Sequence, residues 1–162
     1  MVGMIRVVAM VLAVTSLFCA AQASTSKGVE SLPFNEAADA QAEIRAAMTQ
    51  AATEKKYVLL IFGANWCIDC RELSANMVKS PLSDLIRQRY VVVKVDIGNW
   101  NRNLDVVKAW GDPIAKGIPG VVVADPNGST LYMTKAGEVA NARWMGTEGL
   151  MKFFNALPQS RL

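Results

Sequence analysis

Two cysteines, Cys67 and Cys70, stand two residues apart in the stretch 66–70. Thiols at this spacing can close into a small disulfide ring and open again. An apolar run over 57–62 precedes them and predicts a strand that delivers both thiols to the start of a helix. The N-terminus of a helix stabilises a thiolate, which is the reactive form of cysteine. The spacing therefore indicates a redox centre for thiol–disulfide exchange.

Two other uses of a cysteine pair need to be weighed. A zinc site takes four ligands, but the sequence has no histidine and its only other cysteine is Cys19. A structural disulfide stabilises mainly by closing a longer loop in the unfolded chain, and this ring is short. Two thiolates can still hold a soft ion such as Cu(I), so a metal-binding or assembly module is the alternative function. We expect neither a resident metal nor a cofactor for the redox function.

Residues 1–23 have the pattern of a secretory signal peptide. Arg6 precedes an apolar stretch over 7–18, and Ala21-Gln22-Ala23 is a small-x-small cleavage signature. A membrane anchor would need about 20 apolar residues. We expect cleavage after Ala23, a lead-in segment over 24–34, export to the periplasm, and no membrane span in the mature chain.

Length and charge narrow the class of protein. A chain of 162 residues suffices for one domain with its own core. The formal net charge is +3, and the basic residues are spread singly, which argues against a nucleic-acid partner. Outside the cytosol a disulfide can persist, so an exported cysteine pair would act on the thiols or disulfides of other proteins and depend on a dedicated redox partner.

Helices and strands alternate along the predicted domain, 35–162. Strands are expected at 57–62, 90–96, 120–124 and 130–133, the last two joined by a turn at 125–128. Helices are expected at 35–56, from Cys67 to about 79, after an N-cap at Ser80 with Pro81 as first residue, at 104–110, and after a cap at Thr147. Strands separated by helices are expected to run parallel, and the final hairpin antiparallel. This order predicts an α/β domain.

The order of elements, with the cysteine pair after the first central strand, resembles the thioredoxin fold over residues 35–157. The stretch 62–67, with Trp66 before the first cysteine, is similar to the family's approach to its active site. Gly117-Ile118-Pro119 resembles the family's cis-proline segment, and 93–96 its second central strand. The stretch 70–91 is most similar to the exported subgroup typified by the C-terminal domain of the electron transporter DsbD.

This resemblance implies a central mixed sheet of about four strands flanked by helices, with an extra N-terminal helix. It also implies roles for the site residues. Cys67 would be the nucleophile, and Cys70 would resolve the mixed disulfide. Pro119 would lie opposite the cysteines after a cis bond, so that the main chain of Ile118 can pair with an extended substrate. Trp66 would shape the rim of the site.

The sequence departs from the family where many thioredoxins carry a buried acid, because Ile61 occupies that position. Asp69, Lys94 or a bound water are the candidates to accept a proton from Cys70. The negative charge of Asp69 disfavours a thiolate beside it, and this favours a reductase or isomerase over a strong oxidant. The polar loop 98–103 is expected on the active-site edge, where Trp100 would help to select the partner.

Overall fold

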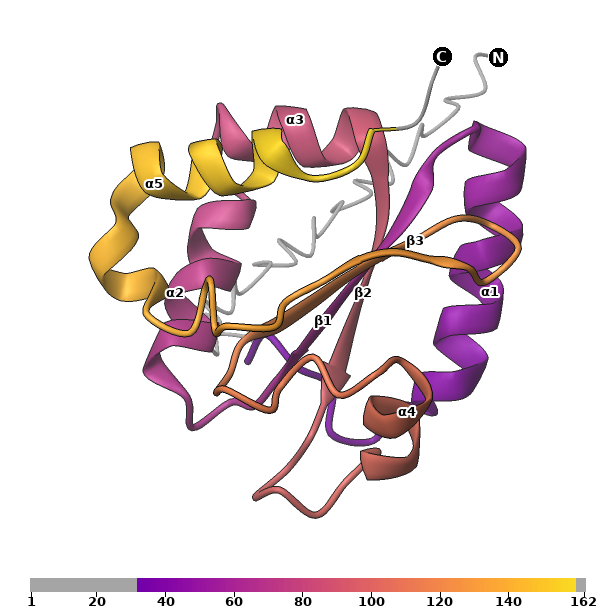
Figure 1. Ribbon diagram of the computed structural model, residues 1–162, viewed down its shortest axis with the longest axis horizontal. Helices are drawn as coiled ribbons and strands as arrows, with labels where there is room; N and C mark the ends of the chain where they lie inside the picture. Colours follow the sequence, from indigo (N-terminus) through magenta and orange to yellow (C-terminus); the bar gives the residue numbers. More distant parts are fainter. Residues whose placement is uncertain (1–31, 160–162) are drawn as a thin grey trace, which may run out of the picture. The chain divides into compact units, whose positions relative to one another are not determined.

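The computed structural model describes residues 32–159 (Figure 1). The expected signal peptide, 1–23, and most of the lead-in, 24–34, lie outside the described residues.

One four-stranded sheet forms the centre of the domain. Strand β1 (Tyr57–Gly63) pairs in parallel with β2 (Tyr90–Asp96). Strand β3 (Gly120–Ala124) pairs antiparallel with the other side of β1, and β4 (Thr130–Met133) pairs antiparallel with β3. The strand order is therefore β2-β1-β3-β4, and the expectation of a mixed sheet is confirmed.

The direction of β3 corrects the expectation that helix-separated strands run parallel. Gly120, the first residue of β3, pairs with Phe62 near the end of β1, so β3 starts at the edge of the sheet where β2 ended. The connection contains only the six-residue helix α4 (Leu104–Ala109), which rises about 9 Å. The seven residues of β2 span about 23 Å. This helix is too short to carry the chain back along β2, and Gly120 pairs near the end of β1, so β3 returns antiparallel.

Helices cover both faces of β1, which is buried from Val58 to Gly63 as its continuous apolar pattern predicts. Helix α1 (Ala40–Glu54) packs on β1 and β2, and Gln41 joins it to α4 through a 3.0 Å hydrogen bond to Asp105. Helices α2 (Ile68–Met77), α3 (Leu82–Arg89) and α5 (Ala142–Ala156) pack together across the sheet from α1 (Figure 1).

The first and third helices begin later than expected. Helix α1 starts at Ala40 instead of residue 35, because the Asp39 carboxylate accepts the Ala42 N–H at 2.9 Å and caps the helix there. Before α3, Pro81 takes the N-cap position, after a cis bond from Ser80. Ser80 does not cap the helix, because its hydroxyl lies 2.5 Å from the Asp84 carboxylate and donates to it.

The last helix begins before the expected cap. Helix α5 starts at Ala142 and is interrupted at Gly146, whose φ of 61° lies in the left-handed region that glycine tolerates. Thr147 follows this interruption instead of preceding the whole helix. The predicted apolar side of the helix still faces the core, where Leu150 and Phe154 are fully buried.

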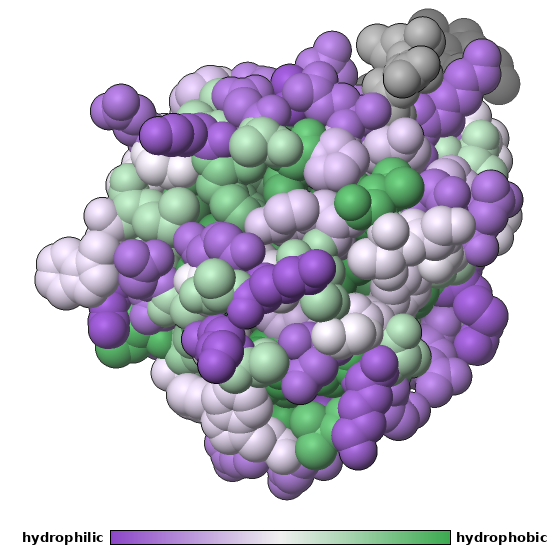
Figure 2. All heavy atoms as spheres, in the orientation of Figure 1, coloured by the Kyte–Doolittle hydropathy of each residue, from purple (hydrophilic) through white to green (hydrophobic). Residues whose placement is uncertain are grey.

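Within residues 32–159, no helix has the length and apolar character that a membrane crossing requires. The face drawn in Figure 2 is mixed, with hydrophilic side chains spread over it and apolar residues showing between them. This matches the dispersed charges of the sequence.

Candidate active site

Cys67 and Cys70 lie at the start of α2 and form a disulfide, with their Cα atoms 5.2 Å apart. Cys67 is the N-cap residue, and its sulfur accepts the Cys70 backbone N–H at 3.1 Å. Cys67 is 6% exposed, whereas Cys70 is 0% exposed. Both cysteines are buried, but their positions differ: Cys67 caps the helix and keeps a small exposed fraction, whereas Cys70 lies in the first turn and keeps none.

The turn between β1 and α2 sets the depth of the pair. Gly63 ends β1, and a Cβ at this position would lie 2.6 Å from Phe34 Cζ and 2.9 Å from Cys70 Sγ. Only a residue without a side chain leaves room for both groups. Phe34 is itself buried, although the sequence placed it in the lead-in segment. A lone aromatic before the first helix gave no signal of this contact.

Asn65 lies in the turn between β1 and α2 and attaches the segment before α1 to this turn. Its side-chain carbonyl accepts the Phe34 N–H at 3.0 Å, and its amide donates to the Phe34 carbonyl at 2.9 Å. The Asn65 side chain thus pairs with both main-chain groups of Phe34, as a neighbouring strand would. This pairing holds the Phe34 ring in place beside Cys70.

The segment before β3 lies against the first cysteine. The sulfur of Cys67 is 3.7 Å from the carbonyl oxygen of Ile118, and the bond from Ile118 to Pro119 is cis. Antiparallel pairing of Gly120 with Phe62 brings this segment to the end of β1 where the cysteines follow. The main chain of Ile118 thus lies next to the redox pair.

Trp66 contacts the loop that follows β2. Its indole N–H donates to the Gly98 carbonyl at 2.9 Å, and its ring centroid lies 6.3 Å from that of Trp100. Trp66 is 51% exposed and Trp100 is 46% exposed. The loop 98–103 therefore lies beside the residue that precedes Cys67, and the two indoles form a partly exposed pair.

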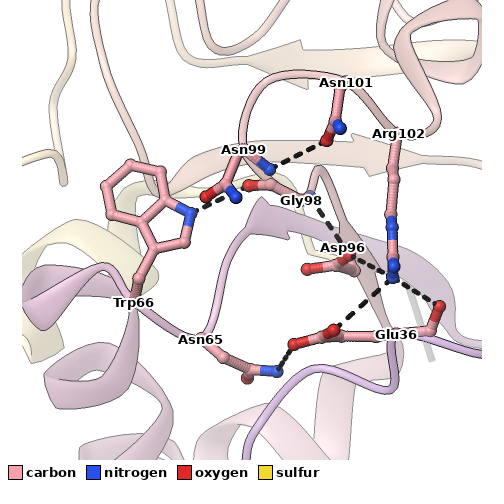
Figure 3. A pocket seen from close by; sticks show the side chains of 8 residues that line it. All are labelled: Glu36, Asn65, Trp66, Asp96, Gly98, Asn99, Asn101 and Arg102. Carbon is pink, nitrogen blue, oxygen red and sulfur yellow. Dashed lines mark hydrogen bonds and ion pairs between the residues drawn. The ribbon is translucent and has the colours of Figure 1, made fainter.

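A polar cavity of about 150 Å³ lies between this loop, Trp66 and the segment before α1 (Figure 3). Arg102 forms an ion pair with the buried Asp96 at 3.5 Å and donates to the Glu36 carbonyl at 2.8 Å. Burial raises the pKa of the Asp96 carboxyl, although the Gly98 N–H that it accepts opposes part of that rise. These contacts hold the loop in one position relative to Trp66.

Asp69 lies between the cysteines but faces α5. It is 9% exposed, and its carboxylate accepts the Arg143 backbone N–H at 3.0 Å. The Arg143 guanidinium Nε lies 3.7 Å from the same oxygen. Arg143 was not identified from the sequence, because no local pattern connects it with a residue so far away along the chain.

Lys94 lies on β2 directly beside Ile61 of β1 and is half-buried. Burial lowers the pKa of its ammonium group. Among the hydrogen bonds of residues 32–159, none joins Lys94 or Asp69 to the Cys70 sulfur. The structure thus brings Trp66 and Ile118 to the cysteines, turns Asp69 toward Arg143, and places Lys94 in the neighbouring strand.

A disulfide that closes at a helix start, with one sulfur at the edge and one enclosed, is the arrangement needed for thiol–disulfide exchange. The mixed sheet and the position of the pair after β1 define a thioredoxin fold. A family profile described as Thioredoxin-like matches residues 39–126, more than half of the chain. The chain belongs to the Thioredoxin-like family, and its class is that of a thiol–disulfide oxidoreductase.

Among solved structures, a disulphide isomerase from Xylella fastidiosa Temecula1 is similar to this chain, with 45% sequence identity. The match covers 76% of this chain and 95% of the isomerase, with a TM-score of 0.75. The oxidised DsbD C-terminal domain of Neisseria meningitidis is 22% identical, with 75% and 97% of the two chains covered and a TM-score of 0.49. No curated protein matches the chain.

Proposed function

We propose that this protein is an exported thiol–disulfide oxidoreductase that exchanges disulfides with protein partners on the reducing side. The observation that carries the proposal is the inequality of the two sulfurs, with Cys67 at the N-cap of α2 and Cys70 enclosed. The 45% identity to a disulphide isomerase supports protein disulfides as the substrates. The signal-peptide pattern of residues 1–23 supports export.

In the proposed reaction, the Cys67 thiolate attacks one sulfur of a substrate disulfide and releases the other as a thiolate, which takes up a proton. Cys70 then loses its proton and attacks Cys67 in the mixed disulfide. This step forms the Cys67–Cys70 bond and releases the second substrate thiol, so two electrons pass to the substrate. Asp69, Lys94 or a water molecule accepts the Cys70 proton.

Two neighbours of the pair would hold the substrate. An extended segment of the partner pairs with the main chain of Ile118, whose carbonyl lies 3.7 Å from the Cys67 sulfur, and Pro119 keeps that part of the chain free of competing donors. The half-exposed Trp66 forms the rim against which the segment packs.

An insulin-reduction assay with dithiothreitol as the electron source tests this proposal. Wild-type protein should accelerate reduction, and Cys67→Ser should abolish the acceleration. Cys70→Ser should instead accumulate mixed disulfides that are visible on a non-reducing gel, because the resolving thiol is gone. Full activity of the Cys67→Ser variant would contradict the assignment.

If the protein is instead a metal-binding module, the same purified wild-type protein should give a different result. Within the described part of the chain, no group of three or more His, Cys, Asp or Glu side chains could hold an ion, so a copper site would depend on the two thiolates. Retention of one Cu(I) per chain, together with no insulin reduction, would favour that alternative.

A further inference from the structure

We propose that Arg143 is a positioning residue of the redox site, which acts through Asp69 to set how readily the Cys67–Cys70 disulfide is reduced. The inference deepens the proposed function and rests on it, since it concerns the same cysteine pair. It assigns a role to a residue of α5, whereas the cysteines lie at the start of α2.

The first argument is the burial of Asp69. A carboxylate that is 9% exposed requires partners, because an unpaired buried charge is costly. Arg143 supplies both a backbone N–H at 3.0 Å and a guanidinium at 3.7 Å to the same oxygen. The N-cap residue of α5, Asn141, makes no side-chain capping bond, so the capping acceptor comes from Asp69 in the first turn of α2.

The second argument is that the Arg143 guanidinium has a second contact besides Asp69. Its guanidinium carbon lies 5.7 Å from the ring centroid of Trp144, in a cation–π contact. The guanidinium thus contacts both an aromatic ring and the Asp69 carboxylate. This arrangement keeps the positive charge near Asp69 even though Arg143 is partly exposed.

The third argument is the location of the Asp69 charge. Asp69 stands in the first turn of α2, in the same helical turn as both sulfurs. A negative charge there disfavours the Cys67 thiolate and so favours the disulfide. When the guanidinium compensates that charge, the thiolate becomes less unfavourable and the pair is easier to reduce. Arg143 therefore shifts the redox balance toward the dithiol form.

The experiment equilibrates the full mature chain with glutathione and measures the reduced fraction. Each disulfide reduced takes two electrons and two protons from two glutathione molecules, which form one glutathione disulfide. Arg143→Gln keeps the backbone N–H and removes the charge. It should lower the equilibrium constant for reduction about two- to fivefold, because solvent screens a partly exposed pair. This change equals a potential about 10–20 mV more negative.

Three variants complete the test. Arg143→Lys keeps the charge and should stay close to the wild type, and Lys152→Gln removes an exposed charge from α5 away from the site and should have no effect. Asp69→Asn should shift the equilibrium in the opposite direction. In the Asp69→Asn background, Arg143→Gln should have little further effect, because its route to the cysteines is gone.

A shift with Arg143→Gln that persists in full in the Asp69→Asn background would overturn the inference, because Arg143 would then act on the sulfurs directly. No shift with Arg143→Gln, alongside normal exchange by the wild type, would overturn the inference and leave the proposed function standing. A wild-type pair that does not equilibrate with glutathione would overturn both. A purely structural contact would lower the melting temperature of oxidised and reduced forms alike and leave the equilibrium unchanged.

Discussion

At the scale of single residues, Cys67 and Cys70 have the same chemistry and different surroundings. Cys67 terminates the turn from β1 and accepts a backbone N–H, a contact that stabilises negative charge on its sulfur. Cys70 lies in the first turn of α2 and is enclosed beside Gly63 and Phe34. This difference makes the order of reaction of the two thiols measurable.

We expect iodoacetamide to alkylate Cys67 about tenfold faster than Cys70 in the reduced protein at pH 7, because both thiolate character and access favour Cys67. Peptide mapping by mass spectrometry after short labelling times measures the two rates. The Cys67→Ser and Cys70→Ser variants serve as single-thiol controls. Faster labelling of Cys70 would reverse the proposed roles.

Lys94 gives a second test at this scale. Burial holds the folded-state pKa of Lys94 below its unfolded value, so the buried charge lowers the stability of the folded protein at pH 7. Lys94→Met should therefore raise the melting temperature at pH 7. The gain should shrink as the pH rises through the folded-state pKa of Lys94 toward 10.5, because the wild-type lysine then loses its charge. Thermal unfolding at several pH values measures this.

The exposed Lys152→Met variant is the control for charge removal. An equal gain at every pH would show that packing, and not the charge of Lys94, is responsible. A changed pH dependence of insulin reduction by Lys94→Met would in addition support Lys94 as the proton acceptor for Cys70.

At the scale of elements, local sequence patterns were sufficient to predict most of the helices and strands. The apolar runs predicted β1 and β2, and the turn at 125–128 predicted the β3–β4 hairpin. Periodicity could not give the direction of β3, because that direction depends on its pairing with β1, a strand distant along the chain. The contacts of Phe34, Asn65 and Arg143 were also missed, because each joins segments that are distant along the chain.

The loop after β2, residues 98–103, provides a test at the scale of elements. Trp100 packs against Trp66, and both rings are partly exposed, so a protein partner docking at Cys67 would cover them. Trp100→Ala should slow exchange with insulin and leave reduction of a small disulfide, such as oxidised glutathione, unchanged. Aromatic residues of this kind often carry a large share of interface energy.

Leu131→Ala removes another exposed apolar side chain, on β4, and should affect neither substrate. If Trp100→Ala slows both substrates equally, then Trp100 supports the site itself and does not dock a partner.

At the scale of the whole molecule, the question is the direction of electron flow. The structure pairs Asp69 with the Arg143 guanidinium, and no histidine lies between the cysteines. Compensation of Asp69 is partial, since the guanidinium is partly exposed. We propose that the balance still favours a reducing protein, which a dedicated donor would keep reduced in an oxidising compartment.

We therefore expect a potential closer to about −270 mV, a thioredoxin-like value, than to the strongly oxidising value of about −120 mV. Equilibration of the wild type with glutathione measures it. A value above about −150 mV would contradict the reducing role and indicate an oxidase.

The burial of Phe34 beside Gly63, where the Cys70 sulfur also lies, has a consequence for the regiochemistry of exchange. Gly63 leaves space for the ring, and Asn65 fixes the main chain that carries it. The ring and the Cys70 sulfur thus both lie beside Gly63, and both residues are buried. We therefore expect an attacking thiol to react with Cys67, and a residue that precedes the first helix of the fold to contribute to the choice between two chemically identical sulfurs.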